Sequence, residues 1–326
     1  MVAAAVLISF AAHGQEPKQA PQVSADADEH IPYSQPRDLA LAEPQALIES
    51  HRYSEAAEKI HTYLQSHPDS AAAHFLLGYT LYRENMPRQS LAEYTLGARF
   101  QNPAASDLAA VAMDYILLQD YQDADKWLTE ATTLSKDSEL YCYYLGRTKY
   151  VENRFNDAIE VFRKCLTLSP HDLRAEYNLG LAYAGAGQID QATTAYQTAI
   201  AWQQSSGVPD PQPYLDFGVM LLEHGKPDQA LPLLQKAVAL GPQNPRAHEQ
   251  LGKTWKLLRN LPNADAEMQA AIRLAPDVSA LHFEMGRIFQ LEGLTAKAKE
   301  EFDRCSALNA SHSTESAATP NLPPRD

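Results

Sequence analysis

Apolar and polar positions alternate along most of the chain with the period of an amphipathic helix. In the segment 139–170, small or apolar residues recur at helical spacing: Leu145, Ala158, Phe162 and Cys165. This spacing predicts a helix that opens near Tyr141, an interruption at Asn153 and a second helix over about residues 156–168. Each helix then has one apolar stripe, so the segment predicts a hairpin of two helices packed face to face.

The same hairpin recurs through the sequence at a nearly fixed interval. Small residues stand 34 residues apart, with one step of 38: Gly78, Ala112, Gly146, Gly180, Gly218, Gly252 and Gly286. An alanine stands twelve residues after each of these positions, except after Gly78, where Ser90 takes its place. Only a minimal side chain lets two antiparallel helices cross closely, so both columns predict helix crossings. Residues that tolerate a positive φ are expected between the two helices: Asn85, Asn153, Gly187, Gly225 and Gly293.

One hairpin of this kind cannot bury both faces of its helices, so successive hairpins must stack and share a core. The columns resemble the tetratricopeptide repeat: Tyr214 to Gly218 continues to Ala230, Leu234 and Pro242 in the family's order. The resemblance implies an all-α fold, a right-handed superhelical solenoid of antiparallel helix pairs. We place the repeats near 37–70, 71–104, 105–138, 139–172, 173–210, 211–244, 245–278 and 279–309. Pro44 replaces the small residue of the first repeat, so its first helix should be short.

Both ends of the chain differ in composition from the repeats. Residues 1–14 hold an apolar run, Val2 to Phe10, followed by Ala12-His13-Gly14, which is typical of a secretory signal peptide. The run is too short for a stable membrane span. We therefore expect a periplasmic or secreted protein, or a cytoplasmic one if residues 1–14 are not a signal. Residues 15–36 and 310–326 have little to bury, and we expect a disordered linker and a disordered tail.

The 38-residue step places four extra residues in the Pro- and Ser-rich stretch 203–211. This stretch is either an ordinary surface insertion, which we favour, or a hinge between two blocks of repeats.

Charge and motifs exclude several classes of function. The formal net charge of -14 argues against a nucleic-acid binder. No phosphate-binding loop, dinucleotide fingerprint, His-Glu-x-x-His or Cys-x-x-Cys pattern is present in the sequence. We therefore expect no enzymatic activity, cofactor or catalytic metal. His74, His248 and His282 recur at the fourth position of their repeats, where a packing role is favoured over a ligand role.

Cys142 and Cys165 lie at similar distances on either side of the turn near Asn153. Antiparallel packing sets them side by side, so they are either small buried residues, which we favour, or a disulfide in an oxidising compartment. Cys305 has no obvious mate.

The resemblance also implies which residues face a partner. In this family the second, fifth, ninth, twelfth and thirteenth positions of the first helix line a concave groove. Those positions hold aromatic and basic residues here: Phe75, Tyr79, Tyr82, Arg83, Tyr143, Arg147, Tyr150, Arg174, Tyr177, Arg246, Lys253, Lys256 and Arg287. Seven of the groove residues are basic, against Glu223 and Glu249. The alternative for several of the tyrosines is packing between neighbouring first helices. Only Asn178 matches the carboxylate clamp of chaperone-binding members, so we do not expect chaperone-tail binding.

Two functions remain after these exclusions. The first is a non-enzymatic scaffold whose groove binds an acidic or apolar segment of another protein, through its Tyr and Arg side chains. The alternative is an envelope polysaccharide-handling or assembly factor, in which the Tyr-lined groove stacks on sugar rings.

Overall fold

The structure, a computed structural model, describes residues 31–33, 38–207 and 209–318, and all the regular secondary structure in these ranges is helical. The described chain forms two compact units, one ending at Ala158 and the other beginning at Ile159. We call them the N-terminal and C-terminal units. The division falls inside α8 (Phe155–Leu168) and not in the stretch 203–211, where the hinge was considered.

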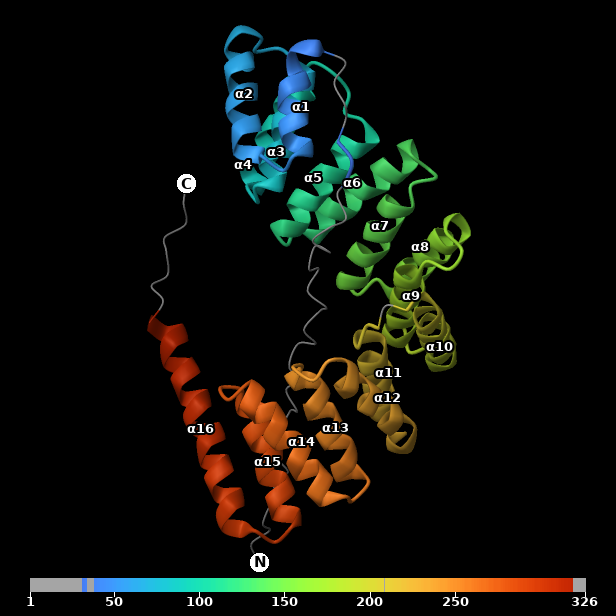
Figure 1. The fold of residues 1–326 in the computed structure, drawn as a ribbon, viewed down its shortest axis with the longest axis vertical. Coiled ribbons are helices and arrows are strands. Elements are labelled where there is room, and N and C mark those ends of the chain that lie inside the picture. Colours follow the sequence, from blue (N-terminus) through green and yellow to red (C-terminus); the bar gives the residue numbers. More distant parts are fainter. Residues whose placement is uncertain (1–30, 34–37, 208, 319–326) are drawn as a thin grey trace, which may run out of the picture. The chain divides into compact units, whose positions relative to one another are not determined.

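Successive helices of the N-terminal unit form antiparallel pairs (Figure 1). Their bounds are η1 (Leu39–Leu41), α1 (Ala42–Glu49), α2 (Tyr53–Ser66), α3 (Ala71–Arg83), α4 (Pro87–Gly97), α5 (Ala105–Leu117), α6 (Tyr121–Leu134) and α7 (Glu139–Val151). Helix α1 has 8 residues where α3 has 13, as expected from Pro44 in the first repeat.

The C-terminal unit continues the same arrangement. Its helices are α9 (Leu173–Gly185), α10 (Ile189–Ser206), α11 (Gln212–Glu223), α12 (Pro227–Leu240), α13 (Pro245–Leu257), α14 (Leu261–Leu274), α15 (Ser279–Leu291) and α16 (Thr295–Ala318). Neighbouring pairs share a core: Ala264, Met268 and Ala271 of α14 pack with Leu281, Met285 and Ile288 of α15 and with Ala298 of α16. The all-α fold of stacked helix pairs is therefore confirmed. None of the described helices is long and apolar enough to cross a membrane.

The small-residue columns lie where the two helices of a pair cross. The alanine column is buried from Ala56 to Ala298, with at most 2% of each residue exposed. A Cβ atom added at Gly78 would lie 2.9 Å from the ring of Tyr94 on the paired helix, and one at Gly218 would lie 2.7 Å from Leu234. Gly78 and Gly218 are thus required by the close approach of the helices.

Positive φ occurs at all five predicted turn residues, Asn85, Asn153, Gly187, Gly225 and Gly293. It also occurs at Gln119 and Arg259, which fill the same place in their repeats with φ of 61° each. Residue types other than Gly and Asn adopt this conformation at a cost, so the sequence did not predict these two turns.

Three sequence expectations differ from the structure. The linker was expected to have almost nothing to bury, but Ile31 within it has no exposed surface. The tail was expected to be disordered from residue 310, but α16 continues to Ala318. Cys142 and Cys165 are buried and disulfide-bonded, while Cys305 is free, so the favoured role as small packing residues is wrong. The predicted signal segment 1–14 lies outside the described residues, as do residues 15–30, 34–36 and 319–326.

We expect Gly286→Ala to destabilise the protein by about 1 to 3 kcal/mol, because the new Cβ would lie 2.6 Å from the ring of Phe302. The matched variant is Gly252→Ala, whose Cβ would meet its nearest atoms at 3.3 Å. There the clash is small, and the helix propensity of alanine offsets it by roughly 0.5 to 1 kcal/mol. Thermal denaturation followed by circular dichroism should show a lower Tm for the first variant alone. Equal Tm values would contradict the steric explanation of the glycine column.

Candidate functional site

The predicted partner-binding residues of the N-terminal unit lie on the first helices α3 and α7. Phe75, Tyr79 and Tyr143 are buried, with only 3 to 4% of each residue exposed. Phe75 and Tyr143 are packing residues, as the alternative interpretation of the tyrosines held, whereas the ring of Tyr79 lies 4.9 Å from the ring of Tyr33, centroid to centroid. The remaining four are partly exposed: Tyr82, Arg83, Arg147 and Tyr150. Sugar stacking needs open ring faces, so the burial of three rings weakens the polysaccharide alternative.

Two tyrosines of this unit hold an arginine one helical turn later. The Nη1 atom of Arg83 donates to the hydroxyl of Tyr79 at 3.2 Å, and Nη1 of Arg147 donates to that of Tyr143 at 3.3 Å. The Arg147 guanidinium also lies 5.6 Å from the centroid of the Tyr143 ring. Since i and i+4 residues share one helix face, the buried ring orients the more exposed cation above it.

A row of polar contacts joins the first helices of the C-terminal unit. The hydroxyl of Tyr177 on α9 donates to Oδ2 of Asp216 on α11 at 2.5 Å, and Nη1 of Arg246 on α13 lies 3.3 Å from Oδ1 of the same carboxylate. Gln212 also donates to Oδ2, at 2.8 Å. Burial, together with the charge of Asp216, raises the pKa of Tyr177 well above its usual value. Tyr177 is therefore a neutral donor, and Asp216 links three helices.

Further along this face, α13 and α15 are joined by a second carboxylate. Lys256 of α13 pairs with Glu284 of α15, and Nη1 of Arg287 lies 3.8 Å from the other oxygen of Glu284. Within α13, Lys253 pairs with Glu249 at 2.5 Å. We call the set from Tyr177 to Arg287 the polar ladder: Tyr177, Asp216, Arg246, Lys253, Lys256, Glu249, Glu284 and Arg287.

The charge of this face is more balanced than the sequence suggested. Asp216 and Glu284 stand at the sixth position of their repeats, which the family's groove positions do not include. Each contacts a cation that was predicted to face the partner. Arg174, the remaining predicted cation of this unit, lies 3.7 Å from Asp172. The most open cations of the ladder are Arg246 and Arg287, whose side chains are each 53% exposed.

The three recurring histidines form hydrogen bonds to the second helix of their pairs, in addition to packing in the core. In each, Nδ1 lies 2.6 to 2.7 Å from a glutamate 19 residues later: Glu93 for His74, Glu267 for His248 and Glu301 for His282. In each, Nε2 lies 2.9 to 3.1 Å from a proline carbonyl six residues earlier. Each histidine therefore connects its own helix to the second helix of the pair and to the loop before the first helix.

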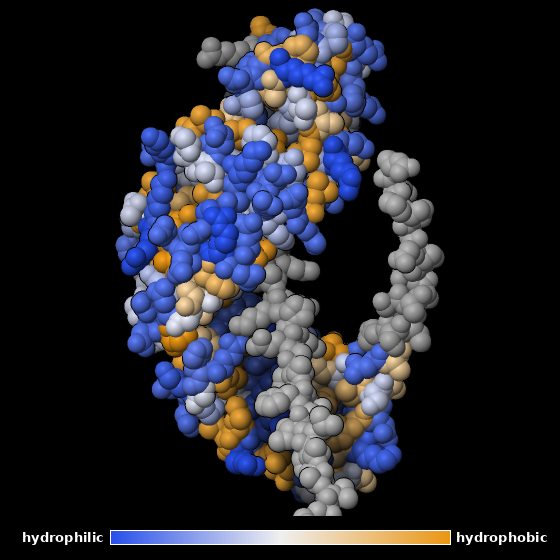
Figure 2. Space-filling model, turned by 180° about the vertical axis from the view of Figure 1, so that it is seen from behind, coloured by the Kyte–Doolittle hydropathy of each residue, from blue (hydrophilic) through white to orange (hydrophobic). Residues whose placement is uncertain are grey.

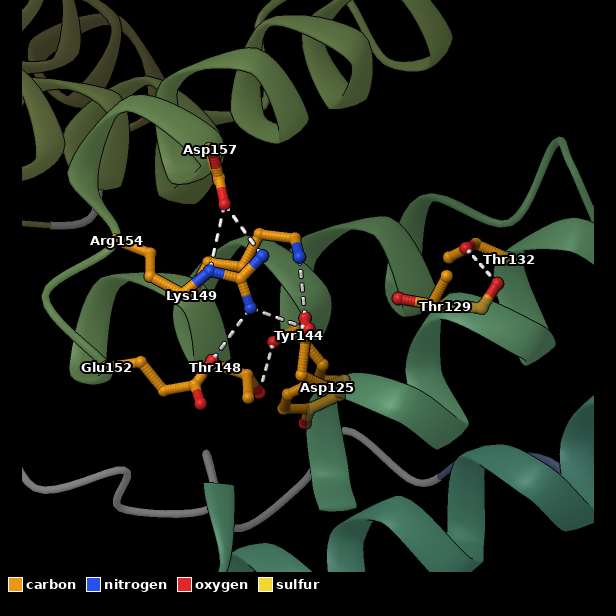
Figure 3. A network of polar contacts seen from close by, with 9 residues as sticks. All are labelled: Asp125, Thr129, Thr132, Tyr144, Thr148, Lys149, Glu152, Arg154 and Asp157. Carbon is orange, nitrogen blue, oxygen red and sulfur yellow. Dashed lines mark hydrogen bonds and ion pairs between the residues drawn. The ribbon is translucent and has the colours of Figure 1, made fainter. Parts of the chain in front are cut away.

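An ion-pair network joins α6, α7 and the turn after α7 (Figure 3). Asp125 of α6 accepts from Nζ of Lys149 at 2.7 Å and from Nη1 of Arg154 at 2.8 Å. Arg154 also contacts Glu152 at 3.2 Å and Asp157 at 2.7 Å. Hydrogen bonds that Arg154 donates to Asp125 and Asp157 raise the pKa of its guanidinium above its usual value. The network fixes the turn between α7 and α8.

One carboxyl group is buried without an opposite charge. Asp114 of α5 has no exposed surface, and its Oδ2 lies 2.5 Å from the hydroxyl of Ser90, which also donates to the carbonyl of Gly78 at 2.8 Å. Its Oδ1 has no hydrogen-bond partner among the described residues. Burial raises the pKa of Asp114 to about 8. Ser90, the exception in the alanine column, is thus the partner of Asp114.

The surface offers no single large apolar patch on the face shown in Figure 2, where hydrophobic residues are scattered among hydrophilic ones. Exposed apolar side chains nevertheless occur on α13 and α15, two of the helices that form the polar ladder. Phe283, at the fifth position of its repeat, is 46% exposed, and Leu257 and Leu291, both at the thirteenth position, are 56% and 46% exposed. Helices α13 and α15 of the C-terminal unit therefore carry both exposed arginines and exposed apolar side chains.

Comparison with known proteins identifies the repeat. Family models described as tetratricopeptide repeat match residues 41–105, 151–208 and 221–282, together more than half of the chain. A solved tetratricopeptide repeat protein from Parabacteroides merdae superimposes with a TM-score of 0.58 at 15% identity, covering 77% of this chain and 97% of that one. This likeness concerns the fold alone.

Two curated relatives match parts of the chain. Anaphase-promoting complex subunit 3 of Schizosaccharomyces pombe is 25% identical over 64% of this chain and 30% of its own length. Human protein O-mannosyl-transferase TMTC1 is 22% identical over 57% of this chain and 21% of its own length. The chain thus spans less than a third of either relative. With its helix pairs, its small-residue columns and the matching family models, the chain belongs to the tetratricopeptide repeat family.

Proposed function

We propose that the protein is a non-enzymatic scaffold of the cell envelope, whose first-helix face binds a peptide segment or domain of a partner protein. The observation that carries the proposal is the polar ladder, in which Arg246 and Arg287 are half exposed on α13 and α15, the helices that also carry the exposed Leu257, Phe283 and Leu291. Arginine and aromatic side chains contribute much of the binding energy in protein interfaces.

Family membership supports the general class. Tetratricopeptide repeat proteins mediate protein–protein interactions, and one relative is by name a subunit of a multi-protein complex. One relative carries the name of a transferase, but this chain matches only 21% of it. The ladder residues are engaged with one another and suit binding, not turnover of a substrate.

The chemistry of the face indicates the kind of segment that fits. Apolar side chains would cover Phe283, Leu257 and Leu291, while carboxylates would pair with Arg246 and Arg287. Because Asp216 and Glu284 already contact these arginines, a bound carboxylate must compete with them. Electrostatics would then contribute specificity more than affinity.

Export remains a proposal from the sequence of residues 1–14. The disulfide-bonded state of Cys142 and Cys165 supports it, since disulfides persist in oxidising compartments. Determination of the mature N-terminus in the native host tests this part: Gln15 would support cleavage, and an intact residue 1 would contradict it.

We expect the double variant Arg246→Glu/Arg287→Glu to capture its native partner at least fivefold less than the natural protein does. The reversed charges would repel acidic side chains and would lie beside Asp216 and Glu284. The measurement is affinity capture from the native host with quantitative mass spectrometry, at low salt and in about 0.5 M salt, where surface attraction is screened. The matched control is Arg273→Glu, an exposed residue of the second helix α14, which should leave capture unchanged. Equal capture by both variants would contradict binding of the partner at the first-helix face. Salt-insensitive binding of polysaccharide would favour the alternative function, polysaccharide handling.

A further inference from the structure

A short piece of the predicted linker lies against the N-terminal unit. Ile31 has no exposed surface, and the ring of Tyr33 lies 4.9 Å from the ring of Tyr79, centroid to centroid, with an angle of 36° between their planes. Residues 31–33 belong to no helix. In Figure 1 they are the short blue stretch set between the parts drawn in grey.

The ring that Tyr33 contacts is part of the predicted partner-binding face. The ring centroids of Tyr79 and Tyr82 lie 6.1 Å apart, and the Tyr79 hydroxyl accepts a hydrogen bond from Nη1 of Arg83 at 3.2 Å. The guanidinium of Arg83 lies 4.9 Å from the centroid of the Tyr53 ring on α2. Tyr33 therefore adds a further ring to an aromatic and basic cluster formed by α2 and α3.

Tyr33 also lies near the end of α1. Burial raises the pKa of Tyr33 to about 12, and the nearby carboxylate of Glu49, the last residue of α1, contributes to the increase. Tyr33 thus lies close to residues of both α1 and α3, and Ile31 is excluded from solvent two residues earlier. Successive side chains of an extended segment point in opposite directions, so residues i and i+2 point the same way. Pro32 also disfavours a helical conformation at Ile31.

We propose that the Tyr79 face of α3 is a binding site for an extended peptide of the form Ile-Pro-Tyr, and that the chain's own residues 31–33 occupy it. This inference deepens the proposed function, and it rests on that function for its biological meaning. A partner segment of similar chemistry must displace residues 31–33 before it reaches Tyr79, Tyr82 and Arg83. The tether gives the internal segment an effective concentration on the order of millimolar, so a free peptide competes poorly with it.

The test uses the full-length protein and a fluorescein-labelled synthetic peptide with the sequence of residues 27–36. The variant Ile31→Gly/Tyr33→Ala vacates the face without altering any helix. We expect fluorescence anisotropy to show saturable binding of the peptide to the variant and at least tenfold weaker binding to the natural protein. A peptide carrying the same two substitutions should bind neither protein.

Two results would overturn the proposal: no binding of the peptide to a variant with undiminished helical circular dichroism, or equal binding to the variant and the natural protein. If the double variant loses helical signal, Tyr33→Ala alone replaces it, since that change removes the ring contact with Tyr79 and keeps Ile31. The charge-reversal test of the proposed function concerns α13 and α15, so either experiment can fail while the other succeeds.

Discussion

Asp114→Asn should make the protein more stable, by on the order of 4 kcal/mol at pH 7. Burial raises the pKa of Asp114 to about 8, whereas the same group in the unfolded chain titrates near its usual value of 3.8. Between these values the unfolded state releases the proton and the folded state keeps it. The stability of the natural protein therefore falls as pH rises from about 4 to 8 and levels off above that range. An amide has no proton to lose, so the variant lacks this penalty.

The hydrogen bonds around Asp114 support the choice of asparagine. A neutral carboxyl donates to Ser90, and Ser90 donates in turn to the carbonyl of Gly78. The amide of asparagine supplies the same donor in the same shape. By contrast, Ser90→Ala restores the alanine column and removes the partner of Asp114. We expect that change to destabilise by about 1 to 3 kcal/mol, because a buried polar group loses its hydrogen bond.

Urea denaturation at pH 5 and pH 8, followed by circular dichroism, measures both effects. The advantage of Asp114→Asn should grow between the two pH values. The control is Asp137→Asn, an exposed site, which should follow the natural protein at each pH. A gain that is absent at pH 8, or that is no larger than at pH 5, would show that Asp114 is not held as a neutral acid.

The features that the sequence predicted are those encoded within one repeat. The small-residue columns at Gly78 and Ala124, and the turn at Asn153, depend on residues at a fixed distance along the chain. Helical periodicity is equally local, so helix pairs are read from it directly. The fold class follows because a single helix pair cannot bury both of its apolar faces, so successive pairs must stack.

The features that the sequence did not predict depend on neighbours in another repeat. Arg246 counts as a groove cation by its position, yet the acid that pairs with it, Asp216, lies 30 residues earlier. Lys256 and Glu284 are separated by 28 residues. Likewise Ile31 carries no periodic signal, since a single apolar residue in a polar stretch finds its contacts only in three dimensions. A count of charges at the groove positions therefore overstates the net positive charge of the first-helix face.

The three histidines show which part of a contact the sequence pattern contains. A Glu 19 residues after His74, His248 and His282 is visible in the sequence. Its significance depends on knowing that the fourth position of the first helix faces the second helix at that distance. Repetition of a polar pair in three repeats is the signal that would have distinguished a fastening contact from a simple packing residue.

Replacement of Glu301 by alanine should destabilise the last helix pair by about 2 to 3 kcal/mol, the largest effect among the three histidine contacts. Removal of one partner leaves a buried group without its counterpart. The side chains of His282 and Glu301 are 6% and 12% exposed, against 9% and 18% for His74 and Glu93 and 12% and 25% for His248 and Glu267. Because water compensates for a lost partner more fully where exposure is greater, Glu93→Ala should cost less and Glu267→Ala least.

Amide hydrogen exchange is the suitable measurement, since helix pairs of a repeat array open locally and a single unfolding midpoint averages over them. Exchange should accelerate most in α15 and α16 for Glu301→Ala. The double variant His282→Leu/Glu301→Leu should recover much of the loss, because an apolar pair of similar volume can replace a buried ion pair. Equal acceleration for the three glutamate variants, or a double variant less protected than Glu301→Ala, would show that burial of the pair does not set its contribution.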